Sequence, residues 1–109
     1  MIEIQLPRLR ENTPQLDFKF VVIKDGEDYI LRGNAQSKYH YEIVAQTLYD
    51  KSKCIGGGRI RFTATKLHAY AFSLDFGVVQ NHIVVTLLGD YCRQNNLELV
   101  TTMGSMWIE

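Results

Sequence analysis

The chain has no excess of charge of either sign. Its 109 residues hold 12 Lys and Arg against 12 Asp and Glu, so the formal net charge is zero. Non-specific nucleic-acid binding needs a basic excess that displaces counterions from phosphates, so a nucleic-acid partner is not expected. A balanced total can still contain a local basic pocket, which leaves small anionic ligands open.

Long hydrophobic runs and cysteines are also scarce. Apolar stretches such as Ile83–Leu88 are far shorter than the roughly 20 residues of a membrane-spanning helix, and the first ten residues do not resemble a secretion signal. Cys54 and Cys92 are far apart and lack metal-type spacing, which predicts two reduced thiols. We therefore expect a cytoplasmic protein with no membrane partner.

The length predicts one compact domain over residues 1–109. Residues 1–17, which contain both prolines, are expected to be an extended lead-in with one short edge strand at Ile2–Leu6. The predicted core covers residues 18–103.

Hydrophobic periodicity in the core predicts the order strand, strand, helix, strand, strand, helix, strand. We expect Ser37 to cap the first helix, which would run to about Lys51. A strand as long as Val78–Gln94 would be unusual, so this segment is predicted to be the second helix. The expected strands are Phe18–Lys24, Tyr29–Arg32 after a turn at Asp25-Gly26, Arg59–Ala64, Leu67–Phe72 and Leu97–Met103. This pattern predicts an α+β fold: a single mixed sheet of about five to six strands packed with two α-helices, one layer of each.

Lys19 lies within a strand that is otherwise apolar. Alternation places Lys19, Val21 and Ile23 on one face of the sheet. The lysine could extend its ammonium to solvent at the sheet edge, or it could be a fixed cation at the rim of an anion site. Both explanations remain open from the strand pattern alone.

His40 is expected in the first turn of the helix that Ser37 caps. Free backbone N–H groups there create a positive potential that favours a neutral imidazole. A neutral ring could accept a proton or act as a nucleophile near pH 7. The ordinary alternative is a histidine that lines the helix–sheet boundary through a hydrogen bond.

Two loops could contribute to an anion site. Gly56-Gly57-Gly58 precedes Arg59 but lacks the Lys-Ser/Thr of a phosphate-binding P-loop. We expect a flexible connection that ends in an available cation. The second segment, Ser73–Gly77, could bind an anion through its backbone amides and the Ser73 hydroxyl, or its serine and glycine could serve turn geometry alone. The three histidines have no metal-ligand spacing, so no metal site is expected.

Several segments form a pattern through their order and spacing. They are Phe18-Lys19 with Val21 and Ile23, Arg32-Gly33, Tyr39-His40, the run from Cys54 through Arg59 to Ile60, and His68, Tyr70, Ser73, Phe76, Gly77 and Gln80. In combination they resemble the Janus/Ocnus family, and the resemblance extends from Phe18 to about Val100.

This resemblance implies a metal-independent, cofactor-free monomeric phosphatase that acts on the phosphorus–nitrogen bond of phosphohistidine in proteins or peptides. It implies that His40 is the essential proton acceptor, that Lys19 binds substrate, and that Ser73-Leu74-Asp75 hold the phosphoryl group largely through their main chain. Arg32 or Arg59 is expected to help Lys19 neutralise the phosphate oxygens. His40 would deprotonate a water or accept the phosphoryl group itself, and the sequence leaves both routes open.

Three positions depart from the pattern that this resemblance implies. Asp75 stands where a small uncharged residue is usual, and Ala71 stands where glycine is common. Asn81 stands where the resemblance implies a histidine, and His82 follows one residue later. A carboxylate that faced phosphate would oppose binding. The sequence therefore keeps a second hypothesis, a non-catalytic phospho-ligand or protein-binding module. A third, a phosphatase for phospholysine or small phosphoramidates, differs only in the leaving group.

Overall fold

The computed structural model describes residues 2–4, 15–34 and 36–105, and six strands in these ranges form one mixed sheet. The order across the sheet is β1-β3-β2-β4-β5-β6; the two outer pairs, β1 with β3 and β5 with β6, are parallel, and the inner pairs are antiparallel. The strands are β1 (Ile2–Ile4), β2 (Gln15–Asp25), β3 (Asp28–Asn34), β4 (Cys54–Thr63), β5 (Lys66–Ala71) and β6 (Glu98–Met103). The helices are α1 (His40–Ala45) and α2 (Asn81–Gln94), with a 3₁₀ turn at Lys51–Lys53. The predicted α+β class is confirmed. Of the expected edge strand Ile2–Leu6, residues 2–4 form β1 and residues 5 and 6 lie outside the described residues.

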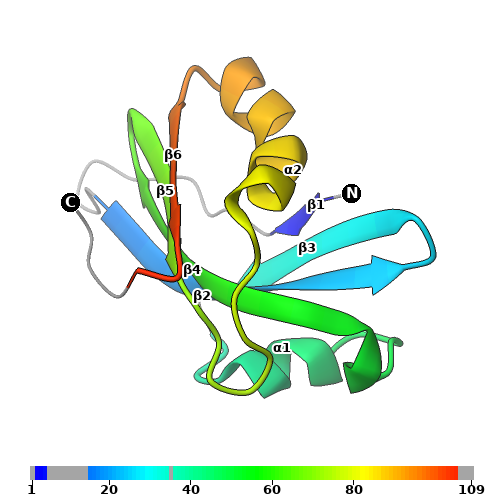
Figure 1. Cartoon of the computed structure of the whole chain (residues 1–109). Coiled ribbons are helices and arrows are strands. Elements are labelled where there is room, and N and C mark those ends of the chain that lie inside the picture. The colour runs from blue at the N-terminus through cyan, green and yellow to red at the C-terminus, as the bar shows by residue number, and fades with distance from the viewer. Residues whose placement is uncertain (1, 5–14, 35, 106–109) are drawn as a thin grey trace.

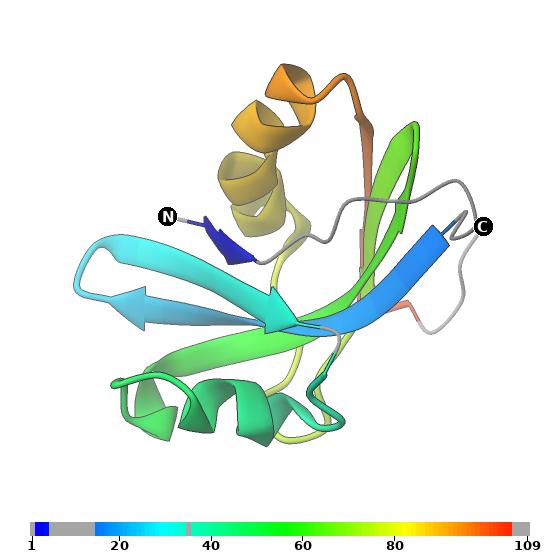
Figure 2. The ribbon, with the colours of Figure 1, turned by 180° about the vertical axis from the view of Figure 1, so that it is seen from behind.

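The two helices cover opposite faces of the sheet, as Figures 1 and 2 show from both sides. Phe20 and Val22 of β2 pack into the large core beneath α2, whereas Val21 packs against Ile43 and Val44 of α1. Successive side chains of a strand point to opposite faces, so this alternation separates the two helices. The predicted single layer of helices is therefore wrong: the order of elements along the chain does not determine which face a crossover helix covers.

The first helix is much shorter than predicted. It begins at His40 after Tyr39, and Ser37 does not cap it. Instead, the Ser37 hydroxyl accepts a hydrogen bond from Gln46 Nε2 at 3.0 Å. At the other end the Thr47 hydroxyl donates to the Val44 carbonyl at 2.6 Å. Hydroxyl groups that bond nearby backbone compete with helix continuation, which accounts for the early end.

The glycine run is strand rather than flexible connection. Gly56, Gly57 and Gly58 lie inside β4, the long strand that pairs with β2 and β5. A Cβ added at Gly57 would lie 2.6 Å from the Phe20 carbonyl oxygen and 2.8 Å from Cδ2 of His40. Glycine has a low β-propensity, so the sequence alone predicts a flexible connection here. In the structure these glycines are in a strand because their lack of a side chain lets β2 and His40 pack closely against β4, so the prediction was wrong.

The second helix and the last strand confirm their predictions. Helix α2 starts three residues later than expected and ends at Gln94, and β6 follows as a parallel edge strand. Cys92 of α2 and Cys54 of β4 are both free thiols, as expected. Within the described ranges, no helix combines the length and the apolar character needed to cross a membrane.

Candidate functional site

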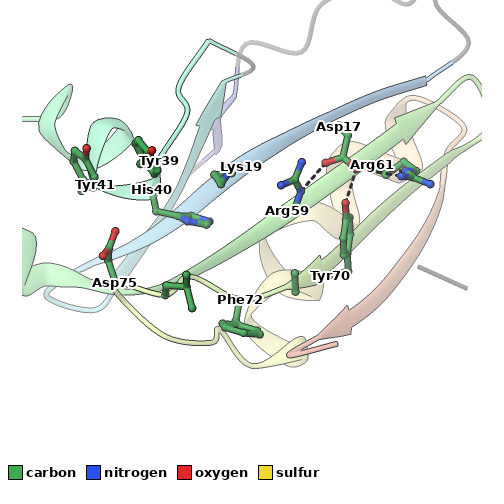
Figure 3. A pocket seen from close by; sticks show the side chains of 12 residues that line it. Asp17, Lys19, Tyr39, His40, Tyr41, Arg59, Arg61, Tyr70, Phe72 and Asp75 are labelled. Atoms are coloured by element: carbon green, nitrogen blue, oxygen red, sulfur yellow. Dashed lines mark hydrogen bonds and ion pairs between the residues drawn. The ribbon is translucent and has the colours of Figure 1, made fainter. Parts of the chain in front are cut away.

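A cavity of about 890 Å³ lies beside α1, on the α1 face of the sheet (Figure 3). Five of the seven predicted site residues line it: Lys19, His40, Arg59, Leu74 and Asp75. They come from β2, α1, β4 and the loop after β5. The fold thus brings together side chains that are up to 56 positions apart in the chain, from Lys19 to Asp75.

His40 is fixed at the inner end of α1. Its side chain is buried, and Nε2 lies 2.9 Å from the Gly58 carbonyl oxygen. A carbonyl only accepts hydrogen bonds, so Nε2 carries the proton and donates it to β4. The bare backbone of Gly57 provides the space in which the ring lies against this strand. In the neutral ring, Nδ1 is therefore the basic nitrogen.

Burial and two cations keep this ring neutral. Desolvation lowers the pKa of His40 below 6.5, and the positive charges of Lys19 and Arg59 lower it further. The hydrogen bond to Gly58 and the charge of Asp75 oppose this shift without cancelling it. The lowered pKa agrees with the predicted neutral imidazole, and burial is its main cause.

Lys19 supplies positive charge to the middle of the cavity. It is half-buried on β2, and its backbone partner across the sheet is Arg59. Among residues 17–34 and 36–105, no carboxylate lies within ion-pair distance of its ammonium group. Figure 3 shows Lys19 between His40 and Arg59, where an anionic ligand would neutralise it.

The loop from Ser73 to Gly77 is held together by its own amides. Ser73 Oγ accepts hydrogen bonds from the amides of Asp75 and Phe76 at 3.2 and 3.1 Å, and Ser73 and Gly77 exchange two backbone hydrogen bonds. Ser73 is buried and does not line the cavity, so its hydroxyl organises the loop. Within the described residues, this leaves Leu74 as the loop residue whose amide has no acceptor.

Ala71 occupies a backbone conformation that favours glycine. Its φ is +64°, in the left-handed region, at the last residue of β5 where the chain turns into the loop. For an L residue this conformation costs about 1–2 kcal/mol. Glycine, which the resemblance implies at this position, adopts this conformation without that cost. This chain has alanine at the same turn.

The far end of the cavity contains an arginine cluster, which we define as Asp17, Arg59, Arg61 and Tyr70. Asp17 Oδ1 accepts from Arg59 Nε at 3.0 Å, and Oδ2 accepts from Tyr70 Oη at 2.5 Å and from Arg61 at 3.4 Å. Burial, together with the hydrogen bond to Asp17, raises the pKa of Tyr70, which keeps its hydroxyl protonated as the donor.

Sequence reasoning missed most of this cluster. Asp17 was assigned to the extended lead-in, although the alternation of β2 continues back to it and places it on the face of Lys19. Conversely, Arg32 does not line the cavity: it pairs with Val21, beneath α1. Among residues 17–34 and 36–105, no group of three or more His, Cys, Asp or Glu side chains is arranged as metal ligands would be.

Comparison with known proteins gives one family. A comparison with curated protein sequences gives no match. The model of the Janus/Ocnus family (Ocnus) matches residues 14–96, which include β2 through α2 and every residue that lines the cavity. The chain belongs to the Janus/Ocnus family.

Proposed function

We propose that the chain is a metal-independent phosphatase that hydrolyses the phosphorus–nitrogen bond of phosphohistidine in proteins or peptides. The observation that carries the proposal is His40, a buried imidazole whose Nε2–H is held by the Gly58 carbonyl and whose pKa is lowered. Its Nδ1 is then an unprotonated base near pH 7, in a cavity that also contains cations.

Three other groups at the cavity would bind the phosphoryl group. Lys19 and the guanidinium of Arg59 supply positive charge for its oxygens, and the amide of Leu74 is a further donor. The phosphorus of a phosphoramidate is already activated, so orientation and charge neutralisation provide most of the catalysis.

Two routes fit this arrangement. In the first, Nδ1 of His40 takes a proton from water as the water oxygen bonds to phosphorus; the P–N bond breaks, and the leaving imidazole receives the proton that His40 returns. In the second, Nδ1 itself bonds to phosphorus as the substrate P–N bond breaks and the leaving imidazole takes a proton from solvent; water then hydrolyses the new phosphohistidine, which returns a proton to solvent and frees His40. Both release inorganic phosphate and histidine.

Asp75 favours an alternative to the phosphatase: a module of the same fold that binds a phosphorylated ligand or a protein but does not hydrolyse it. Its carboxylate lines the same cavity, and its charge raises the pKa of His40 against the other influences. A negative charge at this position opposes the approach of a phosphoryl dianion. Phospholysine or a small phosphoramidate would differ from phosphohistidine only in the leaving group.

The test is the release of inorganic phosphate from a phosphohistidine peptide in the presence of EDTA. We expect His40→Ala to lose at least about 100-fold in turnover, the usual contribution of a general base. His82→Ala is the matched control, since His82 is exposed on α2 and does not line the cavity. Circular dichroism checks the folding of each variant.

Three outcomes separate the hypotheses. Turnover that survives in folded His40→Ala would remove the role assigned to this residue. Loss of wild-type activity in EDTA would contradict metal independence. Phosphate binding by folded wild type without hydrolysis would favour the binding module, and Asp75→Ala would then be tested for gain of turnover.

A further inference from the structure

The cavity is larger than a phosphoryl group requires, and its second half contains further charged side chains. His40 and Lys19 occupy one part, whereas the arginine cluster occupies the other (Figure 3). The following inference rests on the proposed function and concerns which peptide carries the phosphohistidine.

The strand register sets the spacing between these two parts. Lys19 pairs with Arg59, and two residues along the same strands Asp17 pairs with Arg61. Residues i and i+2 of a strand lie on one face, about 6.6–6.8 Å apart. The backbone of the cavity floor therefore presents two rows at that separation, Lys19 with Arg59 and Asp17 with Arg61, and the Arg59 side chain extends from its own row to Asp17.

The arginine cluster has a net positive charge. One carboxylate, Asp17, faces the two guanidinium groups of Arg59 and Arg61, which gives a net charge of about +1 that the phosphoryl group and a second anion would share. These side chains are 22–39% exposed, so the charge is partly desolvated. Arg61 uses Nε and Nη2 for Asp17, and its Nη1 has no acceptor among the described residues. An incoming carboxylate could accept from this nitrogen.

The rim of the cavity suits a peptide. Tyr39 and Tyr41 stack with ring centroids 5.3 Å apart and planes 8° apart, and about half of each side chain is exposed. Leu74, which also lines the cavity, is almost fully exposed. Exposed apolar groups around a charged cavity are typical of surfaces that bind another chain.

We propose that the arginine cluster binds the carboxylate of an Asp or Glu located two residues from the phosphohistidine of the substrate. An extended peptide places side chains i and i±2 on one side at the same 6.6–6.8 Å spacing as the two rows. With the phosphoryl group at Lys19, the second side chain lies over Arg61. The cavity thus selects an acidic phosphohistidine segment.

The test compares two phosphohistidine peptides that differ only at positions −2 and +2, with Glu at both or Gln at both. We expect kcat/KM to be about two- to fivefold higher for the Glu peptide, the usual value of a partly exposed ion pair. Arg61→Gln should abolish this ratio, and Arg61→Lys should keep part of it. Arg93→Gln, which removes an exposed arginine of α2, should leave the ratio unchanged.

Equal kcat/KM for the two peptides in the wild type would overturn the inference while phosphate release still supports the phosphatase. Failure to hydrolyse either peptide would contradict the phosphatase instead, and calorimetric titration of both peptides then decides the inference. Tighter binding of the Glu peptide that depends on Arg61 supports the inference, and equal binding overturns it. A preference that persists in folded Arg61→Gln also overturns it.

Discussion

At the scale of single residues, the chemistry of the cavity depends on the protonation of His40. Burial is the main cause of its lowered pKa, and Lys19 adds to this effect. Asp75 acts in the opposite direction, since a nearby negative charge stabilises imidazolium. Asp75, which departs from the pattern of the family, is thus also the carboxylate that limits the lowering of the His40 pKa.

We predict that the titration of His40, followed by its imidazole NMR signals, has a midpoint below 6.5 and that Asp75→Asn lowers it further. The base form of His40 then persists below pH 6.5, so kcat/KM should fall only on the acid side of that value. The unfolded chain binds this proton first as pH falls. The contribution of His40 to the free energy of unfolding therefore decreases between pH 6.5 and the lower folded pKa.

The control for this titration is Asp90→Asn, which removes an exposed carboxylate of α2 and should not move the midpoint. A midpoint of 6.5 or higher in the wild type would show that the hydrogen bond to Gly58 and the charge of Asp75 outweigh burial. An upward shift in Asp75→Asn would contradict the assigned sign of its charge.

The sequence predicts some residues of the candidate site and misses others. Lys19 is found because it is a polar side chain within an apolar strand, and His40 because it is expected in the first turn of a helix; the structure places both in the cavity. Asp17 was missed because a carboxylate near the start of a strand resembles ordinary surface. The burial of Ser73 follows from hydrogen bonds inside its loop, which spacing does not reveal.

At the scale of elements, β4 determines how closely α1 approaches the sheet. Gly57 and Gly58 provide, respectively, the space beneath the His40 ring and the carbonyl that holds it. In the sequence, three consecutive glycines indicate flexibility, since glycine is unfavourable in strands. The pairing of β4 with both β2 and β5 outweighs that local preference.

We predict opposite effects for alanine at two glycines. Gly57→Ala should destabilise the protein by about 2 kcal/mol or more and lower turnover, because the new methyl group would overlap backbone of β2 and the His40 ring. Gly89→Ala, in α2, has nothing within 4 Å of the new Cβ. It should stabilise by about 0.5–1 kcal/mol through helix propensity, with turnover unchanged.

Urea unfolding gives both free energies, and the phosphohistidine assay gives turnover. Equal stability of Gly57→Ala and the wild type would show that β4 and α1 can separate at little cost. In that case the position of His40 would not depend on the glycine.

At the scale of the whole molecule, the sheet divides the interior into two unequal cores. Among the residues whose burial is described, the core beneath α2 contains 12 buried residues, from Phe18 to Cys92, whereas the core beneath α1 contains three, Val21, Ile43 and Val44. The fold class could be predicted from the order of strands and helices along the chain. The placement of the two helices on opposite faces of the sheet could not be predicted in this way, because it depends on the path of each crossover.

This asymmetry predicts that α1 opens more readily than the rest of the fold. Local opening costs less where few apolar side chains are buried. Backbone amides of α1 should therefore show about tenfold or more lower protection from hydrogen exchange than those around Leu88 in α2. Ile43→Ala should widen the difference, whereas Val85→Ala, at an exposed position of α2, should not. Because His40 is the first residue of α1, such opening would separate its imidazole from Gly58. Equal protection in the two helices would show instead that α1 opens only when the whole domain unfolds, and the cavity would then bind its ligand as a rigid site.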